Sequence, residues 1–386
     1  MSSTPCLAVV ALEWQSVRMK VLGFMSGTSL DAIDMAVLET DGEGIQAFGP
    51  AGERKLSEAT RALVLAATKD ALAWERGTPE PASFAPAAGA IAREHFAAAN
   101  KFLAVSRLNW REIDLVGFHG QTVLHERPQP GRLGRTVQLG DGRLLARLSG
   151  VRVAYDFRSA DVAAGGEGAP LAPIYHQARA AASGIEPPSA VLNLGGVANV
   201  TLFGRETDPL AFDTGPANGM IDLLVQARGL GRYDVDGRLA AAGKVDETAL
   251  RALLSHPYFA APPPKSLDRH DFSLAPVEAL STEDACATLV AFTAEAVALG
   301  VALAKEPPAV VIASGGGRRN PQIMKALAER LPCKLVSAEA VGWRGDAIEA
   351  EAFAYLAARC AKGLPISFPG TTGVPEPMTG GKIARP

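Results

Sequence analysis

Gly-Phe-Met-Ser-Gly-Thr-Ser-Leu-Asp-Ala-Ile-Asp, residues 23–34, is the stretch that decides the fold. An apolar run over residues 20–25 leads into it, a hydroxyl-rich turn covers residues 26–29, and a second apolar run covers residues 33–38. Apolar runs on both sides of a glycine-containing turn predict two buried strands joined by a tight loop. Backbone N–H groups in such a loop can bind phosphate, because glycine lets the backbone come close to the ligand.

A second unit of the same kind lies in the other half of the chain. Residues 190–194 are apolar, Gly195 and Gly196 form a turn, and residues 200–203 resume the apolar run. Two such units predict a duplicated domain with a phosphate-binding hairpin in each half, although shape alone leaves two unrelated hairpins open. Segments that favour helices alternate with apolar strands between the units, which is typical of an α/β protein.

Several other elements are expected from the same patterns. The segment beyond Gly363 is rich in proline, glycine and threonine, and we expect it to be loosely ordered. Helices are predicted over residues 57–68, 84–104, 168–183 and 285–304, and strands over residues 114–120 and 309–314.

Composition excludes several classes of protein. The chain has 386 residues, of which 48% are hydrophobic and 20% charged, as expected for a globular protein of two domains. The net charge of −3 and the lack of a basic stripe argue against a nucleic-acid partner. No uninterrupted apolar run reaches the ~18 residues of a membrane helix. Cys6, Cys286, Cys333 and Cys360 form no CxxC pair, which predicts neither disulfides nor a zinc site and favours a cytoplasmic location.

The domain boundaries follow from these units. Met19 directly precedes the first strand, so residues 1–18 are predicted to be an extension outside the fold. We expect domain I over residues 19–184 together with a C-terminal helix over 346–362, domain II over 185–345, and a tail over 363–386.

Four glycine-rich turns that follow apolar strands are candidate nucleotide-binding loops. The sequence has neither a GxxxxGK[ST] loop nor a GxGxxG after a strand, so the common P-loop and dinucleotide sites are excluded. Asp31, Asp34 and Asp213 could hold Mg²⁺, which prefers carboxylates and retained waters; the direct metal ligand stays unknown. The candidate cofactor-binding residues are Gly27, Thr28, Ser29, Leu30, Asp31, Ala32, Ile33 and Asp34; Asn193, Gly195 and Gly196; Asp213 and Gly215; and Ser314, Gly315, Gly316 and Gly317.

Further motifs accompany these turns in a fixed order. They are HGQT with a following His and Pro (residues 119–128), DFR…D…GGEGAPL (156–171), NLGGVAN (193–199), DTGPAN (213–218) and SGGG…NP (314–321). With them, residues 23–34 closely resemble the GxMSGTSLDGxD signature of anhydro-N-acetylmuramic acid kinases. The sequence departs from the family pattern at three places: Ala32 replaces a glycine, Glu167 replaces a glutamine, and residues 264–272 only partly follow PKSTGRExF.

The resemblance implies a fold and two ligands. The fold is the actin/hexokinase/Hsp70 type, in which two duplicated RNase H-like (actin-like ATPase) domains enclose a nucleotide cleft. ATP with Mg²⁺ would bind in this cleft, between the first hairpin and residues 193–199, with the turn at 314–317 against the adenosine. The family also suggests a homodimer.

The resemblance also implies a reaction and the residues that perform it. ATP, water and 1,6-anhydro-N-acetylmuramic acid would give N-acetylmuramic acid 6-phosphate and ADP, a step in cell-wall amino-sugar recycling. Asp161 corresponds to the catalytic base; Asp156 is a nearby competitor whose alternative role is an ion pair with Arg158. The candidate sugar-binding residues are Gln121, Thr122, Arg158 and Glu167.

Two rival interpretations remain at this point. One is another sugar or acyl-phosphate kinase of the same fold, because the first hairpin by itself does not define the acceptor. The other is a non-catalytic module that senses a sugar without turning it over. An assay of ATP consumption with the anhydro-sugar discriminates among the three.

Overall fold

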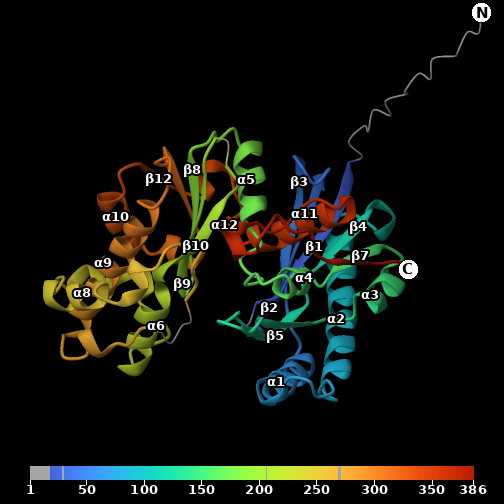
Figure 1. Cartoon of the computed structure of the whole chain (residues 1–386), viewed down its shortest axis with the longest axis horizontal. Helices are drawn as coiled ribbons and strands as arrows, with labels where there is room; N and C mark the ends of the chain where they lie inside the picture. Colours follow the sequence, from blue (N-terminus) through green and yellow to red (C-terminus); the bar gives the residue numbers. More distant parts are fainter. Residues whose placement is uncertain (1–17, 28–29, 206, 268–270) are drawn as a thin grey trace, which may run out of the picture.

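Two β-sheets lie side by side, and helices cover each of them. The segment that contains α11 (Ile348–Lys362) and α12 (Pro369–Thr372) lies between the sheets and beside the first one (Figure 1). The computed structural model describes residues 18–27, 30–205, 207–267 and 271–386. Thr28 and Ser29, two of the predicted cofactor-binding residues, therefore lie outside the described residues.

The first sheet joins the N-terminal strands to one strand from the C-terminus. Its strands are β1 (Met19–Met25), β2 (Ala32–Thr40), β3 (Ile45–Lys55), β4 (Leu115–Phe118), β7 (Arg152–Tyr155) and β13 (Lys382–Ala384). Their order is β13-β7-β4-β1-β2-β3. β1, β2 and β3 form an antiparallel meander, whereas β4 and β7 run parallel to β1.

The second sheet repeats this arrangement. It contains β8 (Ser189–Leu194), β9 (Val197–Phe203), β10 (Leu210–Pro216), β11 (Val310–Ser314) and β12 (Lys334–Ser337) in the order β10-β9-β8-β11-β12. The first three strands are again an antiparallel meander, and the last two run parallel to β8. The same five-strand order and the same directions in both sheets confirm the predicted duplication and the two-domain α/β fold. The predicted boundaries between the domains stay a prediction.

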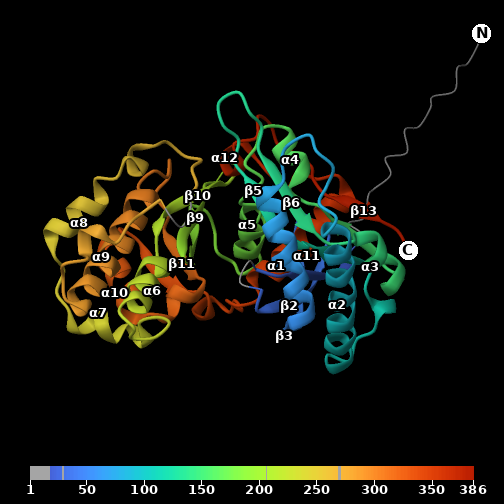
Figure 2. The same ribbon diagram turned by 90° about the horizontal axis from the view of Figure 1, so that it is seen from below.

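Helices pack on both sheets, and their starts follow local capping chemistry. Ser57 and Ser281 each accept a hydrogen bond from a backbone N–H of the first turn of the helix that follows, as N-cap residues do. The helices are α1 (Glu58–Ala73), α2 (Phe84–Val105), α3 (Gly142–Ser149), α4 (Ser159–Ala163), α5 (Pro173–Ala182), α6 (Asn218–Ala227), α7 (Arg238–Ala242), α8 (Glu247–Leu254), α9 (Thr282–Val301), α10 (Pro321–Arg330), α11 (Ile348–Lys362) and α12 (Pro369–Thr372). A separate two-stranded ribbon, β5 (Gln121–Glu126) with β6 (Arg135–Leu139), projects beside the first sheet (Figure 2).

α9 is apolar on all sides because it is the central helix of the second core. It is long and apolar enough to cross a membrane by length and composition, but 78% of its most apolar window is buried inside the protein. It packs against α7, α10 and β10. A helix that is hydrophobic all round and covered by other elements is typical of the core of a large protein.

Two glycines bring α11 directly onto the first sheet. A Cβ atom on Gly23 would lie 2.0 Å from the backbone oxygen of Ala350, and one on Gly117 would lie 2.1 Å from that of Phe353. Any other residue at either position would push the helix away. The close contact fixes the N-terminal end of α11 beside the hairpin of β1 and β2.

Two of the expected elements are wrong in part. The helix predicted over residues 168–183 begins only at Pro173, a residue whose missing N–H suits the first helical position. The tail beyond Gly363 is ordered: β13 pairs with β7, and Thr372 and Val374 are buried. Hydrogen bonds to the rest of the chain, which composition does not reveal, hold this proline- and glycine-rich segment in place.

Candidate active site

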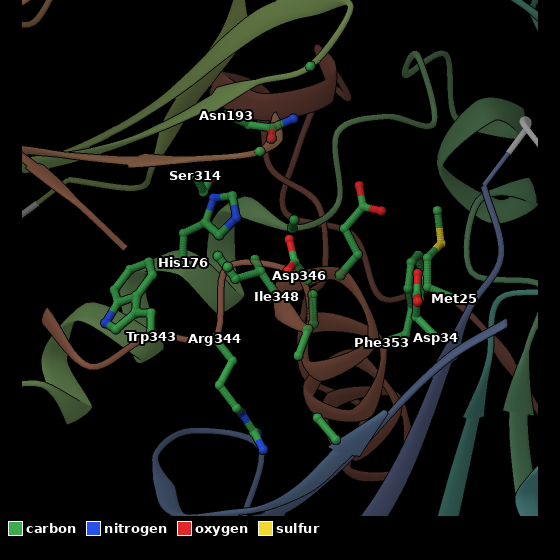
Figure 3. Close-up of a pocket in the computed structure, with 18 of the residues that line it drawn as sticks. Met25, Asp34, His176, Asn193, Ser314, Trp343, Arg344, Asp346, Ile348 and Phe353 are labelled. Carbon is green, nitrogen blue, oxygen red and sulfur yellow. The ribbon is translucent and has the colours of Figure 1, made fainter. Parts of the chain in front are cut away.

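A cavity of about 1310 Å³ lies between the two sheets and is lined by residues from both (Figure 3). From the first sheet come Met25 and Asp34; the loop before α11 and its first turns supply the floor, including Glu349 and Phe353. The predicted site residues that line the cavity are Asp34, Arg158, Asn193, Gly195, Ser314 and Gly315. The structure thus brings together candidates from three of the four predicted turns and from the segment around Arg158.

The turn of the second hairpin is held from behind by α6. The carbonyl of Gly196 accepts hydrogen bonds from the N–H groups of Ala217 and Gly219, at 3.0 and 3.1 Å, and that of Gly195 accepts one from Asn218 at 3.1 Å. Because these carbonyls are used on the helix side, the turn is fixed while Gly195 lines the cavity. Gly196 does not line it.

The fourth turn packs against the second hairpin at a left-handed glycine. Gly315 has a φ of 74°, and its carbonyl accepts a hydrogen bond of 2.7 Å from the Arg318 guanidinium. A Cβ atom there would lie 2.4 Å from Oδ1 of Asn193, so only glycine fits. Gly316 and Gly317 stand away from the cavity; Gly317 is buried against Leu194.

The first loop is anchored by the ribbon of β5 and β6. The side-chain amide of Gln121 donates a 3.1 Å hydrogen bond to the carbonyl of Gly27, and the hydroxyl of Ser26 donates one of 3.3 Å to that of Gly120. Gln121 thus already has a partner within the protein, and Thr122 accepts from Gln138; sugar binding by either stays a prediction. Of the described residues predicted in this loop, only Asp34 lines the cavity, while Gly27, Leu30, Asp31, Ala32 and Ile33 do not.

Two carboxylates of the cavity have raised pKa values. Burial, together with the negative charges of Glu349, Glu53 and Asp346, raises the pKa of Asp34 to about 6. Glu349 stands in the cavity, where water reaches it, yet the surrounding protein still raises its pKa. A group of carboxylates that resist ionisation in the free protein is suited to a divalent cation, whose charge would offset theirs.

The three carboxylates predicted to hold Mg²⁺ do not meet. Asp34 lines the cavity, Asp31 is exposed, and Asp213 accepts a 2.7 Å hydrogen bond from the N–H of Leu267 on the second sheet. Within residues 18–27, 30–205, 207–267 and 271–386, no three His, Cys, Asp or Glu side chains form a metal-binding group. Among the described residues the three carboxylates therefore do not form one metal-binding group, and which of them contacts Mg²⁺ stays a prediction.

Arg158 is fixed by hydrogen bonds to neutral partners. Its guanidinium donates to Nε2 of His119, at 3.2 and 3.0 Å, and to the carbonyl of Gly168 at 2.8 Å. Burial lowers the pKa of Arg158 to about 10, against the opposing charges of Glu349 and Asp161, so the group remains a cation at neutral pH. Burial and Arg158 hold the pKa of His119 well below its usual range. A fixed cation at the cavity wall is suited to an anionic ligand.

Asp161 is almost completely buried, with 1% of its surface exposed. Its Oδ1 accepts a 2.6 Å hydrogen bond from the N–H of Gly168, and its Oδ2 accepts one of 2.6 Å from the hydroxyl of Thr372. Asp161 lies three residues after Arg158 in α4 but does not itself line the cavity. Its catalytic role stays a prediction.

Asp156 forms an ion pair, but its partner is not Arg158, as the sequence analysis had considered. Asp156 forms an ion pair of 2.7 Å with Lys382 of β13 and accepts a hydrogen bond from Ser159, and neither contact involves Arg158. β13 is the partner that the sequence analysis lacked, because the tail was expected to be loose.

A second group of predicted residues connects the two halves of the molecule. Glu167, on the first side, accepts a hydrogen bond from the hydroxyl of Ser266 on the second side, and Arg127 donates one of 2.9 Å to the carbonyl of Ser266. Burial raises the pKa of Asp213 to about 6, and Glu167 contributes to that rise. Gly215, whose added Cβ would meet Ala296 at 2.7 Å, packs on α9 rather than facing the cavity. Glu167, one of the three departures from the family pattern, therefore contacts a second one, the 264–272 segment, at Ser266.

Sequence reasoning missed Arg344 in the cavity wall. Its guanidinium donates to the carbonyl of Gly49 and to the buried Glu351. Arg344 precedes α11 and Glu351 lies within it, so no helical spacing in the sequence links the pair. The neighbouring Trp343 also lines the wall; it is 2% exposed, and its ring N–H donates to Ser183. Thr372 had no local signal at all.

Comparisons with known proteins agree with this geometry. Residues 19–386 match the model of a family described as anhydro-N-acetylmuramic acid kinase. The chain is 71% identical over 368 residues to the anhydro-N-acetylmuramic acid kinase of Phenylobacterium zucineum, with 95% of this chain and 100% of that protein covered. It is 69% identical over 365 residues to the protein of that name from Caulobacter vibrioides, with 95% and 98% covered.

The chain belongs to the anhydro-N-acetylmuramic acid kinase family. More distant members have the same coverage: the protein from Brucella anthropi is 52% identical over 363 residues, which cover 94% of this chain and 98% of that one. Among solved structures, a ROK family glucokinase from Streptomyces griseus aligns with 88% of this chain and 99% of its own, at a TM-score of 0.39 and 13% identity. The family match includes every motif around the cavity and begins at Met19.

Proposed function

We propose that this protein is an ATP-dependent kinase that opens 1,6-anhydro-N-acetylmuramic acid and phosphorylates its O6. The observation that carries the proposal is one cavity lined by Asp34 of the first hairpin, by Asn193 and Gly195 of the second, by the Ser314–Gly315 turn and by Arg158. Two ligands must meet in such a site, because the hairpins suit a polyphosphate and the cation at the wall suits a carboxylate. The family relatives, by their names, act on the same sugar.

The nucleotide would lie along the second sheet. In this arrangement the Gly195 turn and Asn193 would face the phosphates, and the turn at Gly315 would face the adenosine, as the family resemblance implies. Asp34, with Glu349 beside it, would hold Mg²⁺, whose chemistry there is to neutralise the charge on the transferred phosphoryl group. A homodimer and a cytoplasmic location remain predictions.

The sugar would lie toward the segment of residues 158–168. Arg158 is placed to bind the lactyl carboxylate, and the hydrogen-bonded chain of Glu167, Ser266 and Arg127 would close the sugar side between the two halves. This closure excludes bulk water, so that only the reacting water reaches the anomeric carbon.

The reaction balances with Asp161 as the only base. Its carboxylate accepts a proton from water, and the water oxygen bonds to C1 of the sugar. The C1–O6 bond breaks, O6 bonds to the γ-phosphorus of ATP, and the bond between the γ-phosphorus and the β,γ-bridging oxygen breaks to release ADP. The alcohol departs without a separate acid because phosphorus takes up its developing charge.

The experiment combines turnover with two aspartate variants of one segment. The wild-type protein, incubated with ATP, Mg²⁺ and the anhydro-sugar, should give N-acetylmuramic acid 6-phosphate by mass spectrometry, with ADP in equal amount. Asp161→Asn should lower kcat by a factor on the order of 10²–10⁴. The control is Asp156→Asn, five residues earlier, whose partners are Lys382 and Ser159; it should keep kcat.

Each rival predicts a different result in that assay. Another sugar kinase would phosphorylate open N-acetylmuramic acid or another hexosamine faster than the anhydro-sugar. A sensing module would bind the anhydro-sugar without consuming ATP. If Asp161→Asn keeps turnover within about tenfold of wild type, the assignment of the base is wrong.

A further inference from the structure

The C-terminal segment, beyond residue 363, packs against the segment that carries Asp161. After α11 ends, Ile366 and Ser367 form a bridge with Met378, and β13 then pairs along β7. The α12 turn lies within the loop that the bridge between Ser367 and Met378 closes, and it reaches the loop that follows α4. The tail therefore forms a support built against the proposed catalytic segment.

Thr372, the last residue of α12, makes two contacts with that segment. Its hydroxyl donates a 2.6 Å hydrogen bond to Oδ2 of Asp161, and its carbonyl accepts one of 2.7 Å from the N–H of Glu167. Its side chain is 1% exposed, so water does not compete for the hydroxyl. One residue thus holds both the carboxylate and the turn that follows it.

The hydroxyl of Thr372 is not needed to form α12 itself. That task belongs to Thr371, whose hydroxyl donates to the carbonyl of Phe368 at 3.1 Å and accepts from its N–H at 3.0 Å. Two adjacent buried threonines therefore have separate partners: one closes the turn, and the other reaches Asp161.

The contact leaves Asp161 with one fixed orientation. Gly168 donates to Oδ1, Thr372 donates to Oδ2, and a Cβ on Gly166 would lie 2.2 Å from Oδ1. Both oxygens keep a further lone pair, which a carboxylate with four acceptor sites has available for a water. A general base needs an oxygen aimed at the water that it activates, so a fixed orientation of the carboxylate suits that role.

We propose that Thr372 is a positioning residue of the reaction, which acts through Asp161 by orienting its carboxylate. The inference rests on the proposed role of Asp161. The other charged or titratable groups that face this carboxylate are Arg158 in the same segment and His125 on β5. Neither changes in the variants below, so a loss of kcat without a change in KM reports on the Thr372 hydroxyl.

The test compares three threonine variants of the full-length enzyme. Thr372→Val removes the hydroxyl at nearly constant volume and should lower kcat for the anhydro-sugar at least about tenfold, as expected for a lost hydrogen bond to a charged group. KM for ATP and for the anhydro-sugar should stay near wild type, because the buried hydroxyl contacts Asp161 and does not line the cavity. Thr372→Ser keeps the hydroxyl and should restore most of kcat.

Thr371→Val is the matched control. It removes a buried hydroxyl from the neighbouring residue and from the α12 turn, so it should lower the melting temperature while kcat stays near wild type. Equal losses of kcat in Thr371→Val and Thr372→Val, or a loss in Thr372→Val that lies in KM instead of kcat, would overturn the inference. Asp161→Asn separates the two levels: if it stays active, the proposed base is wrong, whereas if it is inactive and Thr372→Val resembles wild type, only the positioning role fails.

Discussion

The hairpins of the two sheets have the same topology, yet they differ in length and in the charge that they bring to the cavity. β8 and β9 are joined by the two-residue turn Gly195–Gly196, whereas β1 and β2 are joined by residues 26–31. The second turn brings the neutral amides of Asn193 and Asn199 to the cavity, and the first brings the carboxylate of Asp34.

The difference suggests that the two duplicated halves bind different parts of the nucleotide complex. A short turn fixed by α6 presents backbone and amide donors in one geometry, which suits an anion such as a phosphate. A longer loop, followed by Asp34 near the start of β2, suits the cation that accompanies the phosphate. The two sheets thus share one topology, and the residues in and beside each hairpin turn give the two halves different ligand preferences.

The largest effect is expected from removing the charge of the first hairpin. Asp34→Asn keeps the shape of the side chain but loses the carboxylate, so Mg²⁺ should bind more weakly and kcat should fall on the order of 10²–10³-fold, several kcal/mol of charge stabilisation. Steady-state kinetics over a range of Mg²⁺ concentrations measures this. If kcat of the variant stays within tenfold of wild type and does not rise with excess Mg²⁺, the first hairpin does not bind the cation.

The next effect concerns the contact between the second hairpin and the Gly315 turn. Gly315→Ala introduces a Cβ at a φ of 74°, 2.4 Å from Oδ1 of Asn193, and should lower the free energy of unfolding by about 2 kcal/mol. Gly316→Ala is the matched control, because its Cβ would meet only Asn218 at 4.0 Å. Chemical denaturation of both variants measures the difference; equal stability would show that the turn can move away from Asn193.

The sequence predicts the strands and hairpins of the two sheets better than the contacts between residues far apart in the chain. Both hairpins follow from local patterns, since a buried strand on each side of a glycine turn is encoded within about fifteen residues. Asn193 and Ser314 were found in the same way, because each stands where a strand of the second sheet ends.

What could not be predicted depends on partners far along the chain. The bond between Thr372 and Asp161 joins residues 211 positions apart, and that between Arg158 and His119 joins residues 39 apart. The tail was expected to be loose because proline and glycine are common in it. Its order comes instead from pairing with the edge of β7 and from hydrogen bonds to the 161–167 segment, which composition cannot show.

A smaller effect, with a defined pH dependence, is expected beside the second hairpin. Asp213 pairs in register with Asn199, and burial raises its pKa to about 6, above the ordinary 3.8. The folded state therefore holds this proton more tightly than the unfolded state, so its stabilising contribution is present below pH 4 and is lost as the pH rises through 6. Asp213→Asn should be more stable than wild type by about 2 kcal/mol at pH 7.5 and equal to it near pH 4.

Unfolding curves at the two pH values measure that difference. The amide can still accept the N–H of Leu267, so the variant keeps the contact that Oδ2 makes. A stability difference that does not change between pH 4 and 7.5 would mean that Asp213 titrates normally and that the second half carries no strained acid.

The smallest effect tests the neutrality of the second hairpin directly. Asn193→Asp places a negative charge where the proposal puts the phosphates of ATP, and it should raise KM for ATP about tenfold, the equivalent of 1.4 kcal/mol. KM for the sugar should change little, and added salt should reduce the effect on ATP because it screens the repulsion. A variant whose KM for ATP equals that of wild type would place the phosphates away from Asn193. In that case the acidic first hairpin and the neutral second hairpin would not be two sides of one nucleotide site.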